Sequence, residues 1–133
     1  MNKQSEETKE STREAVREVF SVMRRHNIPA LMSDVSGRRD VLHMRLTSDT
    51  MIVRLVGNSL DKTDFQRMEE WVERMDKWIK AGLKEFHFWL HQPENIKTAD
   101  MAVFLIEKLQ EKGYKSPCQN QRPILFCYHP SHR

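Results

Sequence analysis

The chain has 133 residues, of which 38% are hydrophobic and 31% charged, and its formal net charge is +3. This length is typical of a single domain, and no apolar run reaches the ~18 residues that a membrane helix needs. Because basic and acidic residues are interleaved, the small excess of positive charge argues against nucleic acid as a partner. The N-terminus has no apolar signal region, so a cytoplasmic protein is expected.

A helix is predicted first, from about Thr12 to His26, where apolar residues recur at helical spacing. Ser11 and Glu14 have the spacing of a capping box, in which Ser11 would be the N-cap. Asn27 is expected to stop the helix in a left-handed conformation. Residues 1–10 are expected to be frayed or disordered.

Three strands and two further helices follow. Strands are predicted over Ala30–Asp34, Met51–Gly57 and Glu85–His91, and helices over Thr63–Ala81 and Thr98–Lys112. Because parallel neighbours need a crossover connection, strands that alternate with helices predict a parallel sheet in an α/β fold. All of residues 1–133 are assigned to one domain.

The tail over residues 115–133 is less regular. It contains one more candidate strand, "PILFCYH", which would be the last element of the sheet. An added strand of this kind could cover one edge of the sheet.

Polar side chains gather where the predicted strands end. In parallel α/β folds ligands bind beyond these carboxyl ends, arginine suits oxyanions, and histidine titrates near neutrality. Alternation along a strand places Arg54 and Asn58 on one face, and His91 is expected to converge with them. His91 is the candidate catalytic residue, and the candidate ligand-binding residues are Asp34, Arg38, Arg39, Asp40, His43, Arg54, Asn58 and Gln92.

Structural explanations exist for several of these residues. Arg54 could pair with Asp34 on the neighbouring strand, which would solve the problem of an interior charge. Asp40 could cap a turn or pair with Arg39, and His43 could be a hydrogen-bonded loop histidine. The sequence leaves these alternatives open.

Neither a metal nor a cofactor is predicted. His87 and His91 are four residues apart, which on a strand separates them by ~13 Å, too far to share one ion. The chain has only four glycines and no glycine-rich phosphate loop.

Three stretches carry a resemblance to a known family: "SDVSGRRDVLHMRLT", "VRLVGN" and "DFQRMEEWVERMDKWIKAGLKEFHFWLHQPEN". Together they closely resemble the C-terminal half of the domain-of-unknown-function 72 family, also called YecE-like proteins. Members of that family are (β/α)8 barrels without an agreed substrate or reaction. A whole barrel needs on the order of 250 residues, so the resemblance implies either a fragment of a longer barrel or a half that is completed by association.

Two functions are therefore expected as alternatives. The first is a barrel half that binds a small anionic metabolite, phosphorylated or carboxylated, at the carboxyl ends of its strands. The second is a non-catalytic assembly or binding module that completes a barrel with a second copy or another partner. In that case an uncovered apolar sheet face should be the interface, and its expected members are Ala30, Met32, Ile52, Val56 and Trp89.

Overall fold

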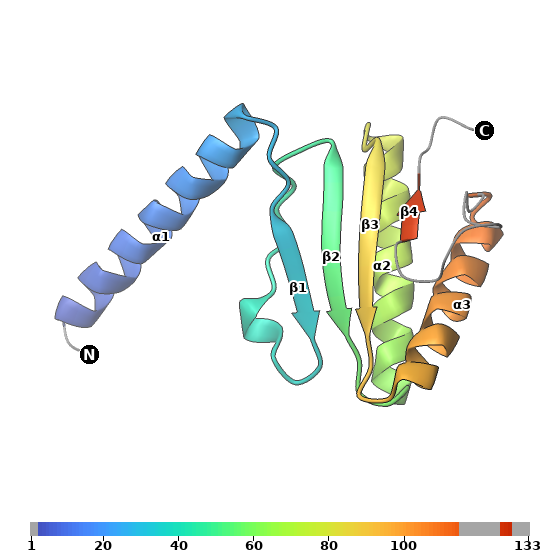
Figure 1. Cartoon of the computed structure of the whole chain (residues 1–133). Coiled ribbons are helices and arrows are strands. Elements are labelled where there is room, and N and C mark those ends of the chain that lie inside the picture. The colour runs from blue at the N-terminus through green and yellow to red at the C-terminus, as the bar shows by residue number, and fades with distance from the viewer. Residues whose placement is uncertain (1–2, 115–125, 129–133) are drawn as a thin grey trace.

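Three parallel strands and one short antiparallel strand form a single sheet in the order β1-β2-β3-β4 (Figure 1). The computed structural model describes residues 3–114 and 126–128. The elements are α1 (Lys3–Arg25), β1 (Leu31–Val35), the 3-10 turn η1 (Arg39–Val41), β2 (Thr50–Val56), α2 (Lys62–Lys80), β3 (Glu85–His91), α3 (Asn95–Glu111) and β4 (Phe126–Tyr128).

The predicted α/β class and the parallel pairing of the first three strands are confirmed. The last candidate strand is present as β4, which runs antiparallel to β3 at its outer edge. The rest of the predicted tail, residues 115–125 and 129–133, lies outside the described residues. No helix in the described part of the chain has both the length and the apolar character needed to cross a membrane.

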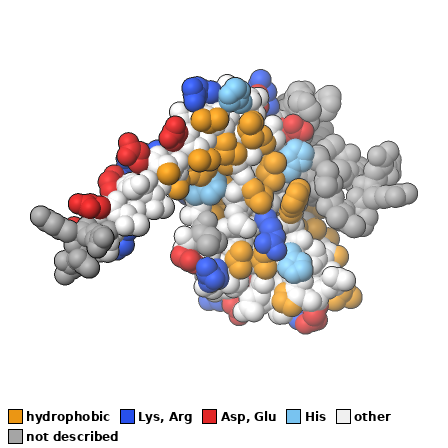
Figure 2. Space-filling view, turned by 60° about the vertical axis from the view of Figure 1, so that its left-hand side comes forward, with side chains coloured by type: hydrophobic (Ala, Val, Ile, Leu, Met, Phe, Trp, Pro, Cys, Tyr) orange, Lys and Arg blue, Asp and Glu red, His pale blue; other side chains and the backbone are white. Residues whose placement is uncertain are grey.

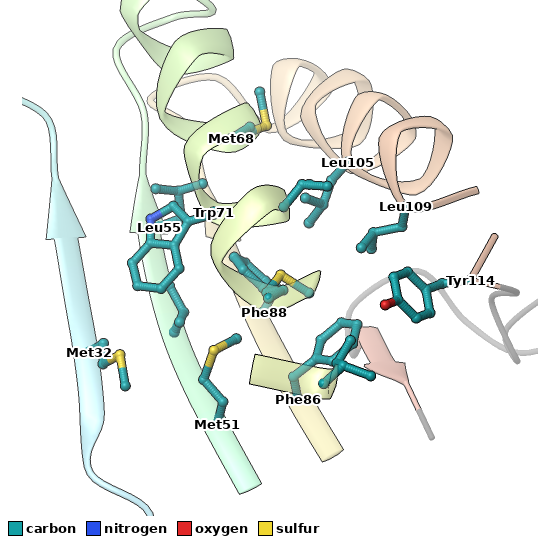
Figure 3. Close-up of a cluster of buried hydrophobic side chains, with 14 of the residues drawn as sticks. Met32, Met51, Leu55, Met68, Trp71, Phe86, Phe88, Leu105, Leu109 and Tyr114 are labelled. Carbon is teal, nitrogen blue, oxygen red and sulfur yellow. The ribbon is translucent and has the colours of Figure 1, made fainter. Parts of the chain in front are cut away.

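Helices α2 and α3 lie on the same side of the sheet and cover one of its faces (Figure 1). Apolar side chains from the strands meet those of the two helices in a continuous core, which includes four buried aromatic residues and several methionines (Figure 3). Burial of this surface is the main force that holds the helices to the sheet. The fully buried side chains include Met32, Met51, Val53, Leu55, Met68, Met75, Phe86, Phe88, Met101 and Leu105.

Helix α1 differs from the other two because it extends away from the sheet (Figure 1). All of its described side chains are exposed except Phe20 and Met23, which are half-buried. The Phe20 ring lies 4.9 Å from the ring of His43, between centroids, and 5.1 Å from the guanidinium carbon of Arg45. These contacts join the second half of α1 to the segment that leads into β2.

Two predicted helix starts are wrong. Helix α1 begins at Lys3, so Ser11 lies inside the helix and residues 3–10 are helical; this stretch is rich in Lys, Gln and Glu, which are good helix formers. Helix α3 begins at Asn95, and the Thr98 hydroxyl accepts a hydrogen bond from the backbone N–H of Gln92. The left-handed stop is confirmed at Asn27, whose φ is 52°.

Candidate functional site

Within the described part of the chain, no helix covers the face of the sheet opposite α2 and α3 (Figure 1). Hydrophobic side chains, with basic and histidine side chains among them, gather on this side of the molecule (Figure 2). Trp89 and Leu31 are the most open of its large apolar residues, with 49% and 44% of their surface exposed. Of the five apolar residues expected on this face, Ile52, Val56 and Trp89 do lie on it.

Ala30 and Met32 were expected on the same face, and this expectation is wrong. Met32 is fully buried and Ala30 nearly so, because the side chains of β1 alternate in the opposite sense, with Leu31 on the open face. A shift of one residue in this assignment exchanges the two faces of a strand.

The strand register arranges the open face in three levels. In each level one residue from β1 lies beside one from β2 and one from β3. Counted toward the carboxyl ends, the levels are Leu31, Ile52 and His87, then Ser33, Arg54 and Trp89, and finally Val35, Val56 and His91.

Arg54 occupies the middle level, between Ser33 and Trp89. Its side chain is exposed and forms no hydrogen bond or ion pair with the described residues. Its guanidinium therefore has all its donors available for a ligand or for an acidic group of another chain.

The predicted alternative for Arg54, an ion pair with Asp34, is wrong. Asp34 lies on the helix-covered face and is completely buried. Its Oδ2 accepts a hydrogen bond of 2.8 Å from Trp71 Nε1, and its Oδ1 lies 3.6 Å from the buried Arg67 guanidinium. The sheet separates Asp34 from Arg54, so the two cannot contribute to one site on the open face.

The Arg38–Asp40 turn is exposed at the carboxyl end of β1. Arg38 donates two hydrogen bonds to Asp40, of 3.0 and 3.2 Å, and this guanidinium lowers the pKa of the Asp40 carboxyl. Arg39 lies 3.9 Å from both Asp34 and Glu70. The expected partner of Asp40 was Arg39, and the structure shows Arg38 in that role.

His43 is a hydrogen-bonded loop histidine. Its Nε2 lies 2.8 Å from the Leu31 carbonyl oxygen, and its Nδ1 accepts a hydrogen bond of 3.4 Å from the Arg45 N–H. With both nitrogens occupied, His43 fixes the segment after η1 to the outer edge of β1.

Gln92 and Asn58 lie where β2 and β3 end, and a buried network holds them there. Gln92 is fully buried; its Nε2 donates to Asp64 Oδ2 over 3.1 Å, and its Oε1 accepts from the Ser59 N–H over 2.8 Å. Asp64 Oδ2 also accepts from the N–H groups of Asn58 and Leu60. Gln92 is therefore a support for the loop and is not open to a ligand, whereas the Asn58 and His91 side chains are exposed.

Sequence reasoning did not identify Asp64 and Arg67, although both organise the strand ends. Arg67 donates two hydrogen bonds to the Val56 carbonyl oxygen, of 2.7 and 3.1 Å. Asp64 falls in the first turn of α2, where an acid commonly binds free backbone N–H groups. This position in the sequence could have identified Asp64 as a residue that binds backbone N–H groups. The partners of Arg67 can be identified only from the three-dimensional contacts.

The more prominent hollows of the molecule lie elsewhere. One, of about 710 Å³, follows the outer side of α2 between Gln66 and Trp78. The other, of about 340 Å³, lies between α1 and Arg45. Neither is lined by Arg54, Asn58 or His91. Among the described residues, no group of three His, Cys, Asp or Glu side chains is placed to hold a metal ion.

Comparison of the sequence with models of known families assigns this chain to a family. The family model described as "Protein of unknown function DUF72" matches residues 10–123, which is most of the chain. The chain belongs to this family. Membership in DUF72 agrees with the resemblance noted from the strand-end motifs, and it brings no reaction with it. No curated protein and no solved structure gives a significant match to this DUF72 chain.

Proposed function

We propose that this DUF72 chain is an assembly module, whose open sheet face packs against a further layer of protein. The observation that carries the proposal is the exposure of Trp89 and Leu31, at 49% and 44%, on the open face of a largely parallel sheet. Parallel sheets occur almost only with both faces covered, and in this chain helices cover one face.

The position of the open face, opposite the helices, supports a barrel-like closure. In a (β/α)8 barrel the strand face opposite the helices is covered because it points into a packed interior, and the resemblance to barrel-forming proteins points the same way. The simplest source of the covering layer is a second copy of the chain related by a two-fold axis, since this is the commonest form of self-association.

Substitution of the two exposed residues tests this function. The double variant Leu31→Gln and Trp89→Gln should reduce the number of associated chains, measured by light scattering at micromolar concentration, because it removes apolar surface from the interface. The matched control is Ile96→Gln on α3, which is 74% exposed but lies away from this face, and it should leave the mass unchanged. An unchanged mass in the double variant would rule out the proposed interface.

A second candidate function is the binding of a small oxyanion by Arg54. The absence of an acidic partner for the exposed Arg54 among the described residues favours it, because an unpaired guanidinium can bind an oxyanion through charge-assisted hydrogen bonds. Phosphorylated or carboxylated metabolites have the right chemistry, and His91 and Asn58 lie nearer the carboxyl ends of the strands. This function does not require catalysis.

Anion binding can be tested by thermal unfolding in sulfate or phosphate against chloride at equal ionic strength. A ligand that binds only the folded state raises the unfolding temperature. We expect a rise for the wild type that Arg54→Gln abolishes, while Arg74→Gln, on the outer side of α2, retains it. If both variants respond like the wild type, the anion does not bind at Arg54.

A further inference from the structure

Helix α1 carries apolar side chains that no other part of the described chain covers. Val16 is 42% exposed and Val19 is 58% exposed. They lie three residues apart and therefore on one side of the helix. Phe20 and Met23 are half-buried against the body, so the stripe is only partly used within one chain.

A basic groove runs beside this stripe. Its volume is about 340 Å³, and its lining consists of Thr12, Arg13, Val16, Arg17 and Arg45. Arg13 and Arg17 share one carboxylate, that of Glu10, at 3.5 and 3.8 Å. Arg45 rests on the Phe20 ring and has no acidic partner among the described residues. Three guanidinium groups thus face a single acid, and the groove has a positive charge that an acidic segment would balance.

The charges of α1 itself provide such a segment. At ~100° per residue, one side of the helix carries two acids and two arginines, namely Glu6, Glu10, Arg17 and Arg24. The acids lie in the first half of the helix and these arginines in the second. Glu6 and its neighbour Glu7 form no ion pair within the described chain. Two such helices that pack antiparallel bring the acidic half of each against the basic half of the other, because a two-fold contact pairs one surface with itself.

We propose that α1 is a self-association site, which binds the α1 helix of a second copy in an antiparallel arrangement. The crossing lies over the groove between Thr12 and Arg17. Val16 supplies the apolar contact, and Glu10 of each chain meets Arg17 of the other. This interface is separate from the open sheet face, and two two-fold contacts whose axes intersect at right angles give a tetramer with D2 symmetry.

Charge reversal tests the pairing of Glu10 with Arg17. Arg17→Glu alone leaves two acids facing each other across the two-fold axis, and Glu10→Arg alone leaves two arginines. We expect each variant to lose about half of the associated mass in light scattering. When the two variants are mixed, each acidic chain meets a basic one, and the lost association should return. Contacts within one chain are the same before and after mixing, so recovery reports only on contacts between chains.

Ser11→Glu is the control, because Ser11 is exposed and lies ~100–140° around α1 from Glu10, Val16 and Arg17, so the substitution adds a carboxylate outside the proposed contact. It should leave the mass unchanged, and Val16→Glu should reproduce the loss seen for Arg17→Glu. All these positions are exposed, and circular dichroism checks that the fold persists.

The proposal is overturned if Arg17→Glu keeps the wild-type mass, or if mixing the two variants restores nothing. If the mass falls only for Leu31→Gln with Trp89→Gln, the sheet face alone mediates association. If the basic groove binds an acidic peptide or anionic vesicles while the chain does not self-associate, the groove serves a different partner, and the proposal is also overturned.

Discussion

Gly57 shows how strictly single residues are constrained at the end of β2. A Cβ atom at this position would overlap the Gln92 amide nitrogen and would lie 2.6 Å from Gln92 Cδ and 2.7 Å from Asp64 Oδ2. The close approach leaves room for glycine alone. Both neighbours belong to the buried network that holds the loop after β2.

We therefore expect Gly57→Ala to destabilise the fold by at least ~2 kcal/mol, because the overlap forces buried polar groups apart. Urea unfolding measures the change. Gly37→Ala is the control: its Cβ would meet no atom within 4 Å, and its φ of +74° should cost only about 1 kcal/mol. Equal effects of the two substitutions would contradict the assigned role of the close contact.

Asp76 links α2 to the end of α3. It accepts a hydrogen bond of 2.6 Å from Lys80 Nζ and another of 2.6 Å from the buried Tyr114 hydroxyl. The bond from Lys80 contributes most, and the bond from Tyr114 next, to lowering the pKa of the Asp76 carboxyl. Asp76→Asn should cost about 1–3 kcal/mol at neutral pH. Because the pKa is lower in the folded state, this contribution is complete above the unfolded value of about 3.9 and is lost as the pH falls further. The stability difference between wild type and variant should therefore shrink in acid.

The positions of some polar residues can be predicted from the sequence, whereas those of others can be known only from the three-dimensional contacts. Alternation along β2 and β3 correctly placed Arg54 and Trp89 on one face, because both strands have a regular pattern. Asp34 was misplaced because β1 has only five residues and polar and apolar types occur on both of its faces. Its partners Arg67 and Trp71 lie more than thirty residues away in sequence, and no local pattern reports such contacts.

At the scale of an element, the first turn of α2 determines the conformation of the loop before it. Ser59 and Leu60 both have positive φ values, of 56° and 62°, which are unfavourable for residues with side chains. The Asp64 carboxylate binds the N–H groups on either side of this turn, at Asn58 and Leu60. The helix thus stabilises a strained loop at the rim of the open face.

Asp64→Ala should cost about 3 kcal/mol, because three hydrogen bonds to a buried charged group are lost together. The loop should also open locally, so hydrogen exchange at the Asn58 and Leu60 amides should accelerate more than exchange in β2. Asp61→Ala, which removes the N-cap bond from the Thr63 N–H and a second bond from the Thr63 hydroxyl, should cost about 1 kcal/mol. A larger effect for Asp61 than for Asp64 would mean that the cap, and not the buried carboxylate, holds the loop.

Helix boundaries were predicted less well than helix positions. The apolar stripe of α2 and the stop at Gly82, whose φ is +114°, were both recognisable in the sequence. The start of α1 was not, because residues 3–10 have no apolar periodicity, and their helicity depends on propensity alone. The capping-box spacing at Ser11 was a coincidence of sequence within a longer helix.

At the scale of the whole molecule, two regions of exposed apolar surface are the open sheet face around Trp89 and the α1 stripe with Val16 and Val19; Ile96 and Val103 on α3 are exposed as well. The sequence predicted the first region, because parallel strands with helices on one side leave the other side free. It did not predict the second, because a repeating apolar spacing indicates a stripe on a helix but not whether another element covers it.

Association through these surfaces makes unfolding depend on protein concentration. When unfolding also separates the chains, mass action raises the midpoint temperature as concentration rises. For a dimer the gain over a roughly hundredfold range is RT ln 100, about 2.7 kcal/mol per dimer, which corresponds to a shift of several degrees for a domain of this size. We expect this shift for the wild type in calorimetry, and a smaller one for Leu31→Gln with Trp89→Gln. Ile96→Gln should behave like the wild type. A midpoint independent of concentration, with a cooperative transition and a mass of 15.9 kDa, would mean that a single chain is stable with its parallel sheet open on one face.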